Sequence, residues 1–332
     1  GHTGTATFDL DGGTFNSNVL RVGHAAGSNG DLNVLSGDVN ATNTAWVGES
    51  GTGTFDLDGG TFNGSTLYVS ENNGSKGDLT VSLTGDFNLS GDLRVGEDNG
   101  SDGTVIQSGG TIDMNRLVTA RNGSGSSSDI DISGGAFTTV GDAWVAYSGT
   151  GTVDVTGGDL DVGGVLRITN QASANGTLTV DGGQLRGDDI RGGSGTDSFN
   201  FSCGTISPFD SNSTIASSAP FTLTCGAGVF NTEDDGAVAR KMTINSVIGD
   251  GGGGFGFSKQ GAGTLTLTNT LMDNDCSNAG GTITSGGGNL ESPGNTCGLD
   301  QGTDQPSVPD PMLGPLQDNG GPTWTHALLP GS

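Results

Sequence analysis

The chain has 332 residues, a net charge of −26 and only 11 Lys and Arg residues, so it lacks the basic patch that a nucleic-acid-binding protein needs. Its 65 glycines do not follow the triplet period of collagen, and no run of about 20 apolar residues predicts a membrane span. Hydrophobic residues make up only 31% of the chain, but they alternate with polar residues, as the narrow core of a solenoid allows.

One short pattern organises the N-terminal part of the chain. Residues 7–16 and residues 54–63 share the sequence Thr-Phe-Asp-Leu-Asp-Gly-Gly-Thr-Phe-Asn. Degenerate copies of its Gly-Gly corner, two of them with Asp in the second place, stand at residues 37–38, 85–86, 109–110, 134–135, 157–158 and 182–183. The corners recur about every 23–25 residues, a period that is typical of solenoids.

Each repeat contains three short extended runs. The first alternates apolar and polar residues, and its inward residues are Phe8/Leu10, Leu32/Val34, Phe55/Leu57, Leu79/Val81, Ile130/Ile132, Val153/Val155 and Leu178/Val180. The second run, after the corner, has one inward residue: Phe15, Val39, Phe62, Phe87, Ile112, Phe137, Leu160 or Leu185. Three strands per coil without helix signals predict an all-β fold, a triangular, right-handed parallel β-helix.

The third run predicts an outward column of Arg and aromatic side chains. The column is Arg21, Trp46, Tyr68, Arg94, Leu117, Trp144 and Arg167. Stacked coils would place Arg beside Trp or Tyr in cation–π geometry, and a row of exposed aromatic residues favours a binding surface for a glycan or a partner. The alternative is that these side chains pack against neighbouring loops or a second layer.

A column of acidic side chains is predicted on the outward side of the first run. Its members are Asp9, Asp56, Asp131 and Asp154, with Asp11, Asp58 and Asp181 beside them. Stacked carboxylates could bind Ca²⁺, which prefers oxygen ligands, although the corners do not spell the calcium-binding nonapeptide. The alternative is a solvated acidic face, and no other cofactor is expected.

The chain is expected to divide into regular repeats at 1–190, irregular coils at 191–270 and a C-terminal region at 271–332. All four cysteines, Cys203, Cys225, Cys276 and Cys297, lie after residue 190. Without CxxC spacing or nearby His they do not resemble zinc ligands, so two disulfides in an oxidising compartment are expected. Three pairings remain possible.

Two C-terminal stretches resemble known families. Residues 258–267, Ser-Lys-Gln-Gly-Ala-Gly-Thr-Leu-Thr-Leu, resemble the autotransporter-associated β-strand repeat of bacterial surface and secreted proteins. Residues 310–323, with the cysteine segments before them, resemble the tail of secreted bacterial right-handed β-helix proteins of the choice-of-anchor or polymorphic outer-membrane-like kind. Residues 1–190 resemble more loosely the Gly/Thr-rich repeats of autotransporter passengers. These resemblances imply a β-helix at the bacterial surface or outside the cell.

We therefore expect a non-catalytic extracellular protein, a rigid acidic stalk or fibre-forming adhesin that contacts cell-surface or matrix components, with glycans among the candidates. Residues 1–5 match mid-repeat residues 49–53, so the sequence is expected to begin within a longer chain, and unpaired strand edges favour head-to-tail self-association. The alternative is a polysaccharide-binding or polysaccharide-degrading β-helix enzyme. Its acid pairs, Asp188/Asp189 and Asp234/Asp235, are sequence neighbours that point apart on a strand, so no catalytic residues are assigned.

Overall fold

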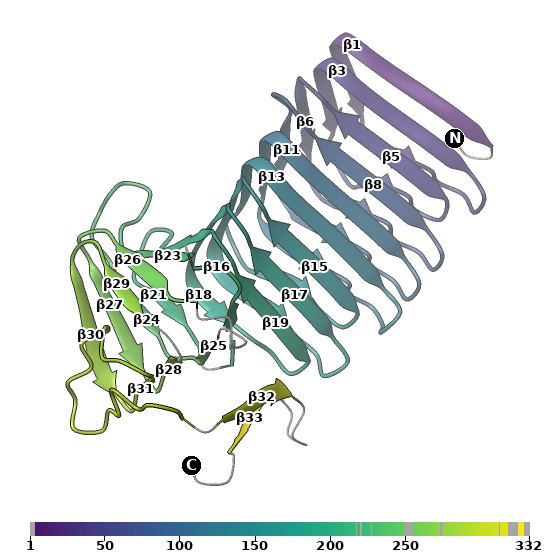
Figure 1. Cartoon of the computed structure of the whole chain (residues 1–332). Helices are drawn as coiled ribbons and strands as arrows, with labels where there is room; N and C mark the ends of the chain where they lie inside the picture. The colour runs from purple at the N-terminus through teal and green to yellow at the C-terminus, as the bar shows by residue number, and fades with distance from the viewer. Residues whose placement is uncertain are drawn as a thin grey trace.

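The computed structural model describes residues 4–216, 218–219, 221–226, 228–249, 255–272, 275–311, 313–317 and 325–328. Within them every regular element is a β-strand, and all but two of the strands belong to one parallel sheet that winds as a solenoid (Figure 1). The predicted β-helix is therefore confirmed. The beginning of the mid-repeat match at residues 1–3 and much of the tail motif at 310–323 lie outside the described residues.

The solenoid has three faces, each a ladder of parallel strands. Face A contains β1 (Thr5–Ser17), β3 (Asn29–Ala41), β5 (Thr52–Leu57), β8 (Lys76–Val81), β11 (Asp102–Met114), β13 (Ser127–Thr139), β15 (Thr150–Val155), β17 (Asn175–Val180), β19 (Thr196–Phe201), β22 (Phe221–Leu223), β25 (Ile248–Gly249), β28 (Leu271–Met272) and β31 (Leu290–Glu291).

Face B contains the second halves of β1, β3, β11 and β13, with β6 (Thr61–Gly64), β9 (Asp86–Leu89), β16 (Asp159–Thr169), β18 (Gln184–Arg191), β20 (Thr205–Ser207), β23 (Gly228–Asn231), β26 (Phe257–Gln260) and β29 (Cys276–Asn278).

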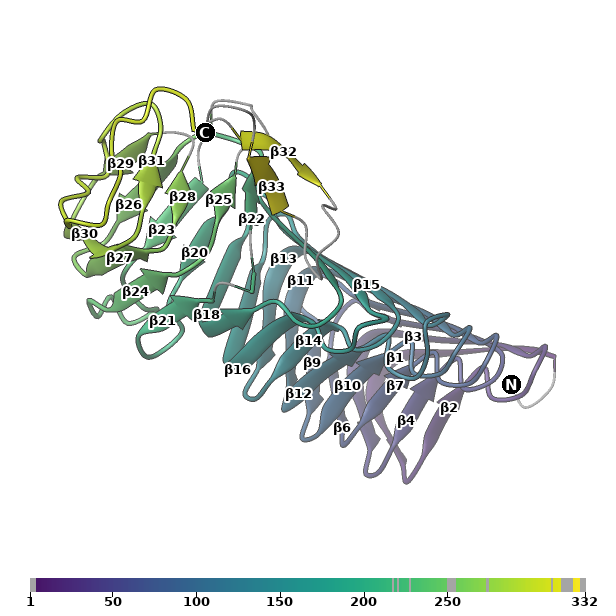
Figure 2. The same ribbon diagram turned by 90° about the horizontal axis from the view of Figure 1, so that it is seen from below.

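Face C contains β2 (Leu20–Val22), β4 (Ala45–Val47), β7 (Leu67–Val69), β10 (Asp92–Val95), β12 (Arg116–Thr119), β14 (Ala143–Ala146), the second halves of β16 and β18, β21 (Ser213–Ile215), β24 (Lys241–Ile244), β27 (Thr264–Thr268) and β30 (Thr282–Gly287). Figure 2 shows the first six of these strands side by side. The remaining strands, β32 (Leu313–Gln317) and β33 (Thr325–Leu328), form a separate antiparallel pair.

The length of a coil varies more than the sequence predicts. On face A, Thr5 pairs with Asn29, and these residues are 24 apart in the sequence. Lys76 pairs with Asp102, 26 residues on, and Asn175 pairs with Thr196, 21 residues on. The closing loops absorb the difference, so the ladders continue across residues 190 and 270 although the sequence pattern changes there.

A column of Phe and aliphatic residues fills the core behind face B. All of the predicted second-run residues from Val39 to Leu185 are buried. The rings of Phe62 and Phe87 stack with centroids 4.4 Å apart, and the ring of Phe55 lies edge-on to Phe62 at 5.4 Å. In the first coil, Phe15 is only partly buried and Phe8 is 44% exposed.

The Gly-Gly corner is required by the close approach of successive coils. Gly60 has a φ of +81°, and a Cβ built on it would lie 2.0 Å from the carbonyl oxygen of Gly37 in the preceding coil. Only glycine allows both the left-handed backbone and this contact. The corner therefore keeps neighbouring coils in register as well as turning the chain.

Both predicted disulfides are present, and the structure selects one of the three pairings. Cys203 bonds to Cys225 and Cys276 bonds to Cys297, and each bond joins consecutive coils. The second bond is buried, with the sulfur of Met272 3.4 Å from that of Cys297. Two disulfides indicate an oxidising environment. In the residues that the model covers, there is no helix long and apolar enough to cross a membrane.

We expect Phe62→Ala to destabilise the protein by about 3–5 kcal/mol, because a fully buried ring is removed from between two others. Phe15→Ala is the matched control, since Phe15 has the same sequence neighbours but is partly exposed, and it should cost much less. Urea unfolding followed by circular dichroism measures both. Equal losses of stability would contradict the buried ladder.

Candidate functional site

The predicted Arg and aromatic residues lie in one outward column on face C. Strand register aligns Arg21 with Trp46, Trp46 with Tyr68, and Tyr68 with Arg94. Further along, Trp144 aligns with Arg167 and Arg167 with Arg191. We call this column the stripe; its residues are Arg21, Trp46, Tyr68, Arg94, Val118, Trp144, Arg167 and Arg191.

The prediction of this column was wrong for one residue. Leu117 pairs with Leu93 and is buried in the core, and the outward position belongs to Val118, which aligns with Arg94 and Trp144. The stripe is therefore interrupted by an aliphatic residue. It consists of one aromatic stack from Arg21 to Arg94 and a second one at Trp144 and Arg167.

The stripe residues contact one another along the axis of the solenoid. The guanidinium of Arg21 lies 4.7 Å from the ring centroid of Trp46, whose other neighbour is the stacked ring of Tyr68 at 5.9 Å. Arg94 covers Tyr68 at 5.3 Å, and Arg167 covers Trp144 at 5.6 Å. The broad faces of Trp46 and Tyr68 are thus occupied by neighbours in the column.

Carboxylates pair with the arginines of the stripe. Arg21 pairs with Glu49 at 2.8 Å, and Arg167 pairs with Asp142 at 3.0 Å. Arg94 bridges Asp92 and Glu97, at 3.1 and 3.2 Å. Two flanking arginines join the same carboxylates: Arg116 pairs with Asp92 and Arg121 with Glu97. The stripe is therefore close to neutral, and its guanidinium groups already have partners within the chain.

A second column, just after three strands of face C, was not predicted from the sequence. Glu49, Glu71 and Glu97 each stand two residues after the last residue of their strand, in the tripeptides Val-Gly-Glu, Val-Ser-Glu and Val-Gly-Glu. We call these three residues the glutamate column. The recurring tripeptide is a signal that could have identified it. Burial, above all, raises the pKa of Glu71, and the indole of Trp46 opposes the shift.

The predicted acidic column lies on the outer side of face A, but only two of its members meet. Asp131 is aligned with Asp154, and with Asp129 they form a group whose carboxylate oxygens lie within 4.8 Å of one another. Asp129, two residues before Asp131, was not predicted. Asp9 and Asp56 are separated by Asn33, whose amide donates to Asp9 at 2.6 Å.

The acidic group on face A offers too few ligands for a calcium site by itself. Ca²⁺ takes six to eight oxygen ligands, about twice what three carboxylates supply when each gives one oxygen. Burial, and then the charges of Asp131 and Asp154, raise the pKa of Asp129. The group is a patch of like charge on the surface of the solenoid.

The acid pairs considered for an enzyme are used in structural contacts. Asp188 accepts hydrogen bonds from the backbone N–H of Phe209 and Ser211, while Asp189 pairs with Arg191. Asp234 pairs with Arg240, and Asp235 pairs with Arg186. Each pair is therefore split between different partners, as its position on neighbouring residues predicts.

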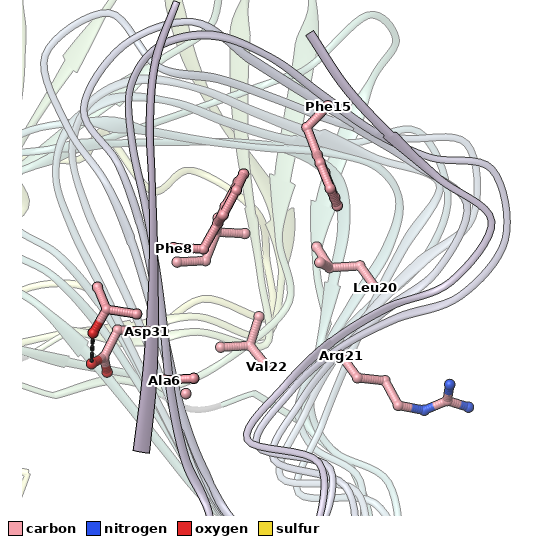
Figure 3. A pocket seen from close by; sticks show the side chains of 10 residues that line it. Ala6, Phe8, Phe15, Leu20, Arg21, Val22 and Asp31 are labelled. Carbon is pink, nitrogen blue, oxygen red and sulfur yellow. Dashed lines mark hydrogen bonds between the residues drawn. The ribbon is translucent and has the colours of Figure 1, made fainter. Parts of the chain in front are cut away.

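A pocket lies at the first coil, where the core begins. Phe8, Phe15, Leu20 and Val22 point into it, whereas the side chain of Arg21 points away (Figure 3). Thr7 donates to Asp31 at 3.1 Å beside it, and most of the other lining residues are apolar. The pocket brings together no acid–base pair of the kind that glycoside cleavage requires.

One further residue departs from the sequence-based expectation. Lys259, in the Lys-Gln-Gly-Ala-Gly motif, is fully buried, and its ammonium group donates to the carbonyl oxygens of Gly261 and Gly280. Burial lowers the pKa of Lys259. This lysine joins a turn to the following coil. There Gly281 leaves no room for a side chain, because a Cβ would lie 2.2 Å from the carbonyl oxygen of Gly263 and 2.3 Å from the lysine nitrogen.

Comparisons of the chain with protein-family models, with curated proteins and with solved structures gave no match.

Because both of its ring faces are covered, Trp46→Ala should destabilise the protein by about 2–3 kcal/mol through lost cation–π and stacking contacts. Trp144→Ala should cost less, about 1–2 kcal/mol, since one arginine covers that ring and Tyr147 meets it edge-on. Urea unfolding of both variants gives the comparison. Unchanged stability in both variants, together with weaker binding to glycans, would instead show that the stripe is a docking surface.

Proposed function

We propose that the chain is a non-catalytic structural protein of the extracellular space, a stiff acidic rod that holds its surface loops at fixed spacing. The observation that carries this proposal is the stripe, because its side chains bind each other across successive coils instead of remaining free. The phenylalanine ladder does the same inside the solenoid. Contacts outside face C and in the core behind face B therefore resist bending and separation of the coils.

Three further features support a location outside the cell. Two disulfides join consecutive coils, which suits an oxidising environment. A charge of −26 keeps such rods soluble and apart from one another at low salt. The resemblance to repeats of bacterial surface proteins agrees with both features. We propose a bacterial cell surface or its surroundings as the site of action.

Glycan binding by the stripe is proposed only for those parts of it that its own residues do not cover. Sugar rings stack on exposed aromatic faces, and both faces of Trp46 and of Tyr68 are covered by neighbours in the stripe. A partner would therefore contact the edges of the stripe together with the polar loops beside it. This contact would add to the structural role of the stripe and would not require its arginines to leave their carboxylates.

The dimensions of the protein in solution provide one test. Thirteen strands form face A, so the stack spans twelve intervals of about 4.8 Å, or roughly 58 Å. Small-angle X-ray scattering should give a rod that contains this stack, with the same profile from dilute to concentrated samples. A compact or flexible particle would contradict the proposal, and growth in length with concentration would show head-to-tail association.

A second experiment separates the structural role from the enzymatic alternative. The protein is incubated with acidic and neutral polysaccharides, and new reducing ends and unsaturated products are measured. We expect no products, because the acids of both candidate pairs have structural partners. Product release that Asp188→Asn abolishes, without loss of folding, would favour the polysaccharide-degrading enzyme instead.

A further inference from the structure

The glutamate column brings three carboxyl groups together in successive coils. The backbone N–H of Glu71 donates to the carbonyl of Gly48, beside Glu49, and that of Glu97 donates to the carbonyl of Ser70, beside Glu71. The three residues therefore occupy one position in three neighbouring coils, about 4.8 Å apart along the ladder. The chain has only five glutamates, and this column contains three of them.

The outer two glutamates have cationic partners, and the middle one does not. Glu49 pairs with Arg21 and His24. Glu97 pairs with Arg94 and, at 2.7 Å, with Arg121 of the following coil. No cationic side chain in the described residues lies within ion-pair distance of Glu71. Glu71 thus stands between two like charges with no cation of its own.

Glu97 is only 5% exposed, and one of its oxygens lacks a donor. Its Oε1 accepts from Arg94, Arg121 and Asn122, two of which belong to the following coil. Its Oε2 is buried and finds no hydrogen-bond donor in the described part of the chain. A buried carboxylate oxygen without a donor costs free energy, and the preceding coil carries Glu71.

We propose that the carboxyl group of Glu71, when protonated, donates a hydrogen bond to Oε2 of Glu97, so that one proton joins two neighbouring coils. The proton resides on a carboxyl oxygen of Glu71, and Oε2 of Glu97 accepts the hydrogen bond. The glutamate column is then a pH-sensitive contact between neighbouring coils. When Glu71 loses the proton, three carboxylates repel one another along the column.

The surroundings of Glu71 favour this assignment. The charged and titratable groups near it are Tyr68 on its own coil, Glu49 with Arg21 and His24 on the preceding side, and Arg94, Glu97, Asp98 and Arg121 on the following side. Burial is the main cause that raises the pKa of Glu71, and Glu49, Asp98 and Glu97 raise it further. The indole of Trp46 lowers it in part.

The raised pKa of Glu71 determines how the stability of the folded protein depends on pH. The folded protein holds the Glu71 proton at a pH above the ordinary glutamate pKa of about 4.3, at which the unfolded chain has largely released it. Stability is therefore gained as pH falls through the folded pKa and is lost as pH rises through it. Asp56 and Asp129 shift in the same direction, so the effect of Glu71 must be isolated by comparing variants.

The test is a titration of the protein labelled with ¹³C at the glutamate carboxyl groups. Five resonances are expected, and the one that belongs to Glu71 should titrate above the ordinary glutamate pKa. Glu71→Gln should remove that resonance. Glu49→Gln is the matched control, because it alters the same position one coil away in a residue that has cationic partners, and it should keep the shifted resonance.

Two more measurements make the outcome decisive. Glu97→Gln removes the acceptor charge while it keeps an amide oxygen for the arginines, so Glu71 should titrate at a lower pH than in the unaltered protein, while burial still holds its pKa above the ordinary value. Glu71→Gln should raise the midpoint of thermal unfolding at neutral pH and reduce its increase on acidification, whereas Glu49→Gln should not. The inference is overturned if Glu71 titrates with the other glutamates, or if Glu97→Gln leaves its midpoint unchanged.

Discussion

The parallel register of the coils is the constraint on which the rest of the structure depends. Residues at one position recur about 4.8 Å apart along each face, so every side chain has its own counterparts as neighbours. Phe62 lies on Phe87, and Asn16, Asn40, Asn63 and Asn88 form a chain of amide hydrogen bonds of 2.9 to 3.3 Å. A few inward side chains per coil then suffice for the core, which explains how a chain with 31% hydrophobic residues folds.

The same register makes charge a difficulty, because an acidic residue kept at one position becomes a stack of like charges. The repulsion within such stacks is met in three ways along the chain. On face A, Asn33 separates Asp9 from Asp56. On face C, arginines alternate with the carboxylates that they neutralise. Where neither arrangement is present, at Asp129 with its two neighbours and at Glu71, burial and then the neighbouring carboxylates raise the pKa of a carboxyl group. These positions are where protons or cations can act on the solenoid.

The sequence was sufficient for the fold because the signals repeat. Period-two alternation placed the inward residues of the regular coils, and the glycine corners marked each coil. Prediction failed where a repeat departed from the pattern. In Arg116-Leu117-Val118-Thr119 two apolar residues are adjacent, so alternation cannot say which faces inward, and the wrong one was placed in the stripe. Lys259 was missed because a lysine is expected at the surface, whereas here glycine carbonyls solvate its ammonium group. Cysteine spacing left three pairings that only the coil geometry could reduce.

The stripe shows why a row of aromatic and basic residues does not by itself identify a binding surface. In a solenoid, neighbours in the column approach each ring from both sides along the axis, which is where a ligand would stack. Each arginine reaches a carboxylate in its own coil or in a neighbouring one. An anionic partner would therefore have to compete with an intramolecular pair whose groups are already held in place. Arg/aromatic contacts of this kind stabilise the rod, and specificity has to come from positions that the register does not repeat. In this chain those positions are the loops between the strands, where coil length varies.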